Sequence, residues 1–298
     1  MKVGRFAGFL TLCFLASFGQ GRAAILQEGA SDWVRTEYGI LRIISSTGHL
    51  NDQGATLIGV QIRLQPGWKT YWRTPGEAGV PTQFDWEGSK NVASAKVEWP
   101  TPRRFSEYEM ETFGYEGEVI FPVYLSAESA GEAVDIRLKL NYGVCMNVCI
   151  PMESRLQLSL EPKAAPLATD SDRTRYGRHI DRFLKKVPAP NGGNGLNIEH
   201  VLLRESDDSR EIEVQAVGDP PMTWPDLAVE LPPGHRLGIP LVDISRDRKL
   251  VRLRMPILSQ EGAETIVGSV VSVVVWDEDG RSVEHQLEVG RAPELDAN

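Results

Sequence analysis

The sequence predicts an all-β protein built from two antiparallel β-sandwich domains, with a linker that carries one short helix. Three observations favour this fold class. Apolar and polar residues alternate with period two along most apolar runs, turn-forming residues separate these runs at short intervals, and 298 residues exceed a typical single domain. Closely spaced turns are typical of antiparallel sandwiches rather than of alternating strands and helices.

The amino terminus has the pattern of a secretory signal peptide, residues 1–23. A basic start is followed by the apolar run Phe6–Phe18 and by small residues at Gly21 and Ala23, where a signal peptidase would cut. The run has 13 residues, whereas a membrane span needs about 20. We therefore expect cleavage after Ala23, loss of Cys13 with the signal, and a soluble mature chain in an oxidising compartment, the bacterial periplasm being the simplest.

Residues 24–162 are expected to form the first sandwich, which would hold the redox chemistry discussed below. Four runs have the composition and alternation of strands, and Gly, Pro, Asn and Asp residues lie between them. The expected strands are 55–64, 119–125, 134–140 and 156–160.

Residues 163–196 differ from the sandwich in composition and are expected to form a linker. Four prolines, at 162, 166, 188 and 190, and a glycine-asparagine run bracket a charged stretch. Within it apolar residues recur at helical spacing, and Thr169 or Asp170 would cap the helix. The apolar residues are Tyr176, Ile180, Phe183 and Leu184.

Residues 197–298 are expected to form the second sandwich, a degenerate copy of the first. The segment from Pro122 to Tyr142 and the segment from Pro256 to Trp276 have the same spacing of 20 residues and the same order of turn and long strand. Asp277–Gly280 marks a tight hairpin where the first copy has a longer cysteine-containing loop. The expected strands are 198–203, 211–217, 227–231, 249–255, 267–276 and 283–289.

Charge and motif content exclude several functions. The formal net charge of −9 opposes binding to a phosphate backbone, which needs clustered Lys and Arg, so no nucleic acid partner is expected. The five histidines are scattered, and the chain has neither a Gly-x-Ser-x-Gly elbow nor a His-Glu-x-x-His helix. A zinc site or a hydrolase is therefore not favoured, and no cofactor is expected.

The loop that contains Cys145 and Cys149 favours redox chemistry. Three residues separate the two cysteines, and a loop folded back on itself would bring the sulfurs within bonding distance. As a passive staple, so small a ring would contribute only about 2 kcal/mol. A short, exposed disulfide exchanges readily with an attacking thiolate. No Lys or Arg adjoins either cysteine, and Arg155 is the nearest basic residue along this segment.

A copper site is the alternative interpretation of the same loop. Cys145, Met146, Cys149 and Met152 supply two thiols and two thioethers within eight residues, and soft sulfur ligands suit Cu(I). Ordinary apolar packing also accounts for the two methionines. A third interpretation is a β-sandwich adaptor in which the disulfide is inert.

Several ordered motifs resemble one known family. Over about residues 35–160 the chain resembles the amino-terminal, immunoglobulin-like domain of the DsbD-type thiol-disulfide interchange proteins, and Trp68–Arg73 is closer still to the ScsB-like branch associated with copper tolerance. The second domain resembles the extra amino-terminal domain of that branch. The motifs are Gly67–Gly76, Val80–Trp86, Glu98–Pro100, Thr112–Tyr115 and Tyr142–Pro151.

The resemblance implies a relay of electrons through a component of a protein-disulfide reductase system. In the family, the cysteine pair of this domain accepts electrons from a thioredoxin-like module fed through the membrane and then reduces periplasmic clients. Cys145 and Cys149 would be the redox pair. The resemblance implies that Phe113, or else Tyr115, shields the pair. It implies also that Tyr71 and Tyr142 line the site, although core packing explains these two tyrosines equally well.

Two departures from the family modify this expectation. The cysteines are separated by three residues rather than five, so the order of attack is not carried over. The sequence contains neither a membrane-spanning segment nor a Trp-Cys-x-x-Cys motif. We therefore expect a stand-alone periplasmic carrier that serves thioredoxin-fold partners and depends on a separate membrane electron donor of DsbD or CcdA type.

Overall fold

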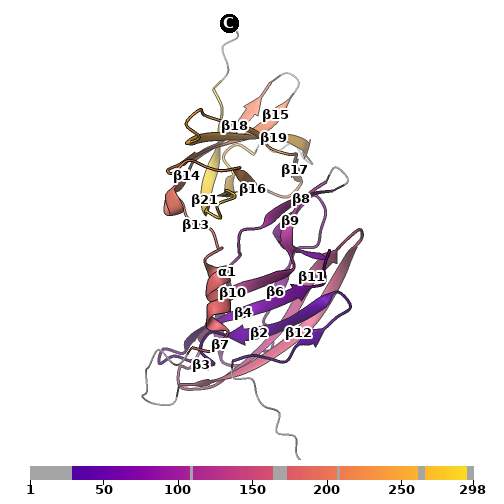
Figure 1. Ribbon diagram of the computed structural model, residues 1–298, viewed down its shortest axis with the longest axis vertical. Coiled ribbons are helices and arrows are strands. Elements are labelled where there is room, and N and C mark those ends of the chain that lie inside the picture. Colours follow the sequence, from indigo (N-terminus) through magenta and orange to yellow (C-terminus); the bar gives the residue numbers. More distant parts are fainter. Residues whose placement is uncertain (1–28, 108–109, 164–172, 207–208, 261–265, 294–298) are drawn as a thin grey trace, which may run out of the picture.

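The computed structural model describes residues 29–293 apart from 108–109, 164–172, 207–208 and 261–265. The expected signal peptide, Cys13, and the expected helix caps Thr169 and Asp170 lie outside the described residues. Strands dominate what is described, and they gather in two bodies, one from each half of the chain (Figure 1). The all-β prediction is confirmed.

The first half forms two facing sheets, which are antiparallel apart from the parallel pairing of β3 with β12. One sheet has the strand order β1-β2-β4-β10-β7, and the other has the order β3-β12-β11-β5-β9-β8 with β6 paired to β11. The strands are β1 (Val34–Arg35), β2 (Gly39–Ser45), β3 (His49–Leu50), β4 (Ala55–Leu64), β5 (Lys69–Gly76), β6 (Gln83–Asp85), β7 (Val92–Val97), β8 (Arg103–Glu107), β9 (Met110–Glu116), β10 (Glu118–Ala127), β11 (Val134–Cys145) and β12 (Cys149–Pro162).

The core of this sandwich follows from the alternation of each strand. Val60 of β4 and Phe121 of β10 are fully buried on one sheet, and Leu140 of β11 is fully buried on the other. Successive side chains of a strand point to opposite faces, so the polar residues between these positions face outward. Trp72 of β5 is the largest fully buried side chain and belongs to the same core.

The linker forms the short helix α1 (Gly177–Leu184), which packs against β10 of the first sandwich (Figure 1). Its N-cap is Tyr176. Ile180 and Phe183 are buried in the first core, as their helical spacing predicts. Gly59 of β4 makes room for them, since a Cβ there would lie 3.1 Å from Cγ1 of Ile180.

The second half forms a continuous path of strands, β16-β20-β21-β14-β15-β19-β17, with β13 on β21 and β18 on β19. Val273 near one end of this path and Leu253 near the other belong to one buried core. The path therefore folds over itself into a sandwich. The elements are β13 (Ala189–Pro190), η2 (Gly193–Gly195), β14 (Leu196–Glu205), β15 (Arg210–Gly218), β16 (Asp226–Glu230), β17 (His235–Leu237), β18 (Leu241–Ile244), β19 (Leu250–Gln260), β20 (Val270–Trp276) and β21 (Ser282–Arg291).

Charged and aromatic contacts join the two sandwiches. Arg73 of β5 donates to Glu230 at 2.8 Å and to Glu284 at 2.5 Å. The ring of Phe113 on β9 lies edge-on to Trp276 of β20, with centroids 6.3 Å apart. The strand that passes beside the cysteine hairpin, β5, therefore also contacts the second sandwich. No helix among the described residues is long and apolar enough to cross a membrane.

Candidate functional site

The two cysteines close the β11–β12 hairpin. Cys145 is the last residue of β11, Cys149 is the first of β12, and the two are directly opposite each other in the antiparallel register. Met146, Asn147 and Val148 form the connection. Opposed residues of an antiparallel pair project to the same face, so the hairpin itself holds the two sulfurs together. Both cysteines are free thiols in this structure.

The two sulfurs differ in exposure. Cys145 is 5% exposed, whereas Cys149 is exposed. A partner thiol or disulfide that approaches from solvent therefore meets Cys149 first, and Cys145 lies behind it.

Tyr71 of β5 lies beside the pair. Its hydroxyl is 2.9 Å from the sulfur of Cys149. The ring occupies a slot between two glycines, since a Cβ would lie 2.7 Å from Cε1 of Tyr71 if built on Gly79 and 3.0 Å from Cδ2 if built on Gly143. Gly79 also has φ +141°, a conformation that favours glycine. Both glycines are thus needed to bring the hydroxyl to the sulfur.

The protonation of this cluster follows from burial. Burial raises the pKa of the Tyr71 phenol well above its usual value, and its hydrogen bonds to the cysteines raise it further. The phenol therefore remains protonated at neutral pH and can donate to a thiolate. Burial raises the pKa of the Cys145 thiol as well, and the neighbouring Cys149 adds to this effect. Cys145 is accordingly held mainly as the neutral thiol.

Lys69 is a member of this site that sequence reasoning missed. It is buried at the start of β5 and is the register partner of Cys145. Its positive charge lowers the pKa of Cys145, and hydrogen bonds from Tyr71 act in the same direction, although both effects are smaller than the effect of burial. No basic residue adjoins the cysteines along the chain, so only the pairing of β5 with β11 reveals Lys69. Its position two residues before Tyr71, on the same strand face, was the available signal.

The other aromatic candidates lie away from the sulfurs. Tyr142 is buried, and its hydroxyl is 3.3 Å from the hydroxyl of Ser154. Tyr115 is buried, and its hydroxyl donates to the carbonyl of Pro100 at 2.7 Å. The structure places both tyrosines in the core of the first sandwich.

The ring of Phe113, the expected lid, lies against Trp276 of the second sandwich as well as against the first. Its ring lies 6.2 Å from that of Trp72, edge-on, with the guanidinium of Arg104 4.8 Å above it. In β9 the register partner of Tyr71 is Gly114. Phe113 therefore projects to the face opposite Tyr71. The shielding role of Phe113 stays a prediction, and it would need β9 to rearrange.

The two methionines of the alternative copper site lie on different sides of the hairpin. Met152 is the register partner of Tyr142, three positions from the cysteine pair, and packs against the core. An odd separation places it on the opposite face from the sulfurs. Met146 is 38% exposed, and its methyl group lies beside Gly67. Within the described ranges no group of three or more His, Cys, Asp or Glu side chains is arranged to hold a metal ion.

Comparisons with known proteins find a family match in each half of the chain. Residues 46–161 match the family described as thiol:disulfide interchange protein DsbD, N-terminal. This range contains the cysteine hairpin, Tyr71 and Lys69. Residues 186–292 match a domain of unknown function, DUF8393. No curated protein matches the chain significantly.

The solved structures that are similar to this chain include one that spans both sandwiches. The N-terminal periplasmic domain of ScsB from Proteus mirabilis is 24% identical, has a TM-score of 0.71, and is matched over 100% of its length by 89% of this chain. That likeness shows that the fold extends over both sandwiches. The reduced N-terminal domain of DsbD from Neisseria meningitidis is 14% identical with a TM-score of 0.24, and the match covers 46% of this chain and 91% of that one.

Proposed function

We propose that this chain, whose first sandwich is similar to the DsbD amino-terminal domain, carries electrons by thiol-disulfide exchange at Cys145 and Cys149. The observation that carries the proposal is the hairpin geometry. An exposed Cys149 faces a buried Cys145 across a three-residue connection, and the hydroxyl of Tyr71 lies 2.9 Å from the outer sulfur. This arrangement supports Cys149 as the sulfur that a partner attacks first and Cys145 as the sulfur that resolves the mixed disulfide.

Loading of the carrier begins with the Cys145–Cys149 disulfide. A thiolate of the donor attacks the sulfur of Cys149, the Cys145–Cys149 bond breaks, and a mixed disulfide forms on Cys149 while Cys145 leaves as a thiolate. The charge of Lys69 favours this leaving thiolate. The second thiol of the donor then attacks the donor sulfur of the mixed disulfide. Cys149 is released reduced, and the donor is left as a disulfide.

Unloading runs through the same sulfurs in the opposite direction. The thiolate of Cys149 attacks a client disulfide, one client sulfur leaves, and Cys145 then attacks Cys149 to release the second client sulfur. Cys145 must lose a proton for this last step, and burial raises its pKa. The neutral thiol is a poor nucleophile, so burial of Cys145 slows this last step.

The partners that fit this chemistry are thioredoxin-fold proteins of the bacterial periplasm, supplied with electrons by a membrane donor of DsbD or CcdA type. The expected signal peptide, residues 1–23, and the periplasmic origin of the similar ScsB domain support that compartment. The exposed side chains of Met146 and Val148 flank Cys149 and would contact such a partner.

Trapping of mixed disulfides in cells tests this proposal. A Cys145→Ser chain cannot resolve the bond on Cys149, so we expect it to accumulate covalent adducts that reductant releases. Mass spectrometry of the released partners should identify thioredoxin-fold proteins. The Cys149→Ser chain is the matched control and should trap at most one tenth as much.

An absence of adducts on both variants would contradict the proposal. Adducts on Cys149→Ser alone would keep the exchange chemistry but reverse the order of the two sulfurs.

A further inference from the structure

Strand β5 leaves its regular pairing directly after Tyr71, the residue whose hydroxyl lies beside Cys149. The ladder with β9 runs as far as Tyr71 and resumes at Gly76. Residues Trp72–Pro75 therefore form a bulge opposite the single residue Phe113. Contacts other than this ladder must hold the bulge in place.

The second sandwich anchors the bulge through Arg73. The guanidinium donates to both oxygens of Glu230, at 2.8 and 3.2 Å, and to Glu284 at 2.5 Å. The hydroxyl of Thr74 donates to Glu230 as well. The side chains of Arg73, Glu230 and Glu284 are only 24%, 23% and 30% exposed. A forked guanidinium–carboxylate pair fixes direction as well as distance, so the bulge is tied to two points of the other sandwich.

Both carboxylates are held by their own sheet. Glu230 is the last residue of β16, Glu284 lies in β21, and β20 runs between these two strands. Ser272 of β20 donates to Glu284 at 2.7 Å. The anchor is therefore part of a hydrogen-bonded sheet rather than a pair of loop side chains.

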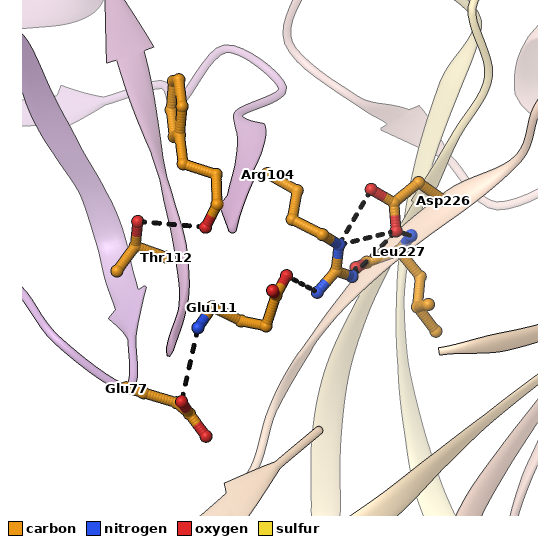
Figure 2. Close-up of polar contacts among 7 residues, drawn as sticks. Glu77, Arg104, Glu111, Thr112, Asp226 and Leu227 are labelled. Carbon is orange, nitrogen blue, oxygen red and sulfur yellow. Dashed lines mark hydrogen bonds and ion pairs between the residues drawn. The ribbon is translucent and has the colours of Figure 1, made fainter. Parts of the chain in front are cut away.

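A second arginine fixes the other end of β16 to the first sandwich. Arg104 of β8 donates to Asp226, the first residue of β16, at 2.8 Å and to the carbonyl of Leu227 at 2.6 Å (Figure 2). The same guanidinium donates to Glu111 of β9 at 3.2 Å. Arginines of the first sandwich thus bind β16 at both ends, so β16 cannot shift relative to β5 without breaking charged hydrogen bonds.

The position of Tyr71 depends on the backbone that this anchor holds. Tyr71 lies two residues before Arg73 on the same strand, and its carbonyl accepts from the hydroxyl of Thr82 at 2.8 Å. Its own hydroxyl is 2.9 Å from the sulfur of Cys149. Hydrogen bonds weaken steeply when their geometry is distorted, so a small displacement of β5 is enough to weaken this donor.

We propose that the second sandwich positions Tyr71 through Arg73, and that it thereby sets the reactivity of the Cys149 thiolate toward a partner. Arg73 is a positioning residue, because its guanidinium is bound to the second sandwich and it acts through the hydroxyl of Tyr71. This role rests on the exchange function proposed above, and it gives the second sandwich a part in that chemistry.

Alkylation of Cys149 by iodoacetamide at pH 7 tests the proposal. The Cys145→Ser chain is used, in which Cys149 is the remaining cysteine after the expected cleavage. Arg73→Met breaks the anchor from one side, and the double change Glu230→Gln, Glu284→Gln breaks it from the other. We expect both to slow alkylation about threefold or more, because the hydroxyl is misplaced in both. The two changes alter the local charge in opposite directions, so an electrostatic effect alone would speed one reaction and slow the other.

The Tyr71→Phe change in the same chain identifies the route. Once the hydroxyl is absent, Arg73→Met should alter the rate less than about 1.5-fold, because there is no donor left to misplace. Arg63→Met is the matched control. It breaks an ion pair with Glu118, 2.7 Å long, within the first sandwich and should be alkylated at the parental rate. Far-UV circular dichroism confirms that each variant is folded before its rate is compared.

Three outcomes would overturn the proposal. The first is a parental rate in either folded anchor variant, and the second is a pair of opposite shifts in the two. The third is equal slowing by Arg73→Met with and without the Tyr71 hydroxyl, which would exclude Tyr71 from the route. These rates are measured on the free thiol without a partner. A failure of the exchange function, seen as an absence of trapped mixed disulfides, is therefore distinguishable from a failure of the anchor.

Discussion

The two sandwiches each contain a long antiparallel hairpin, and the two hairpins end very differently. In the first sandwich, β11 and β12 end in an exposed Cys149 and a buried Cys145. In the second, β20 and β21 end in a turn closed by Asp277 and Arg281 at 2.6 Å. The side chain of Asp277 is fully buried, and Gly280 adopts φ +82°, which suits a tight turn.

One hairpin end is fully paired, whereas the other leaves a reactive group accessible. Every oxygen of the Asp277 carboxylate has a donor, from the backbone of Arg281 or from its guanidinium. A carboxylate paired in this way stabilises one conformation of the turn, and neither of its oxygens is left without a donor. The hairpin of the first sandwich presents instead a sulfur with a single hydroxyl donor and open access to solvent.

The largest effect is expected from the exposed cysteine. Cys149→Ser should reduce thiol-disulfide exchange with a thioredoxin-fold disulfide at least a hundredfold, because the sulfur that a partner attacks first is lost. The rate is followed by the change in partner tryptophan fluorescence. Asp279→Ser, at the exposed tip of the other hairpin, is the control and should leave the rate unchanged. A Cys149→Ser chain with the parental rate would remove the proposed asymmetry between the two sulfurs.

The second effect concerns stability and belongs to the other hairpin. Arg281→Met leaves the carboxylate of Asp277 buried without its partner, which costs about 3–5 kcal/mol. Urea denaturation should show this loss, and the exchange rate of the folded chain should not change. Arg155→Met breaks an exposed pair with Glu153 on the cysteine hairpin, whose side chains are 71% and 49% exposed, and should cost at most about 1 kcal/mol. Equal losses of unfolding free energy in the two variants would contradict the proposed structural role of the Asp277–Arg281 turn.

The third effect tests the hydroxyl beside Cys149. Tyr71→Phe keeps the ring in its glycine slot and removes the donor to the sulfur. A hydrogen bond to a charged group contributes about 1.5–3 kcal/mol, so alkylation of Cys149 at pH 7 should slow roughly tenfold. Tyr142→Phe, whose hydroxyl faces Ser154 in the core, is the control. An alkylation rate unaffected by Tyr71→Phe would show that the contact between the Tyr71 hydroxyl and the Cys149 sulfur does not activate the thiol.

The fourth effect is the pH dependence of the buried cysteine. Burial disfavours the thiolate and raises the pKa of Cys145. In a Cys149→Ser chain, alkylation of Cys145 should therefore reach half its maximal rate above the usual thiol pKa of roughly 8.5. Iodoacetamide labelling across a pH series measures this. A midpoint below 8 would show that Lys69 and Tyr71 outweigh burial.

The smallest effect is expected from the methionines. The double change Met146→Leu, Met152→Leu should alter the exchange rate less than twofold, because Met152 packs on the far face of the hairpin and Met146 lies beside Gly67. The same double variant separates exchange from copper binding. A thioether-dependent Cu(I) site would lose affinity in this variant, as bicinchoninate competition would show.

Local pattern predicted much of the fold. Strand β4 begins and ends at Ala55 and Leu64 as the alternation predicts, and β11 begins at Val134 as expected. The helix places Ile180 and Phe183 in the core, as their spacing predicts. Strand β5 lacks a simple alternation because Lys69, Thr70, Tyr71 and Trp72 are all buried. Its position therefore depends on tertiary pairing rather than on periodicity.

Only part of the candidate site could be predicted from the sequence, because the rest also depends on tertiary pairing. The cysteine pair is local, so spacing alone indicated it. Lys69 approaches Cys145 only through the pairing of β5 with β11, and Tyr71 approaches Cys149 only because Gly79 and Gly143 make room. Phe113 projects to a face that is set by the register of β9 with β5. The residue spacing within Thr112–Tyr115 does not indicate this register.

The most direct test of the exchange chemistry is to mix the reduced chain with limiting glutathione disulfide and follow the products by mass spectrometry after rapid acid quenching. We expect glutathione to appear first on Cys149, and this adduct then to convert to the Cys145–Cys149 disulfide with release of the second glutathione. A first adduct on Cys145, or a Cys149 adduct that never converts in the parent chain, would contradict it.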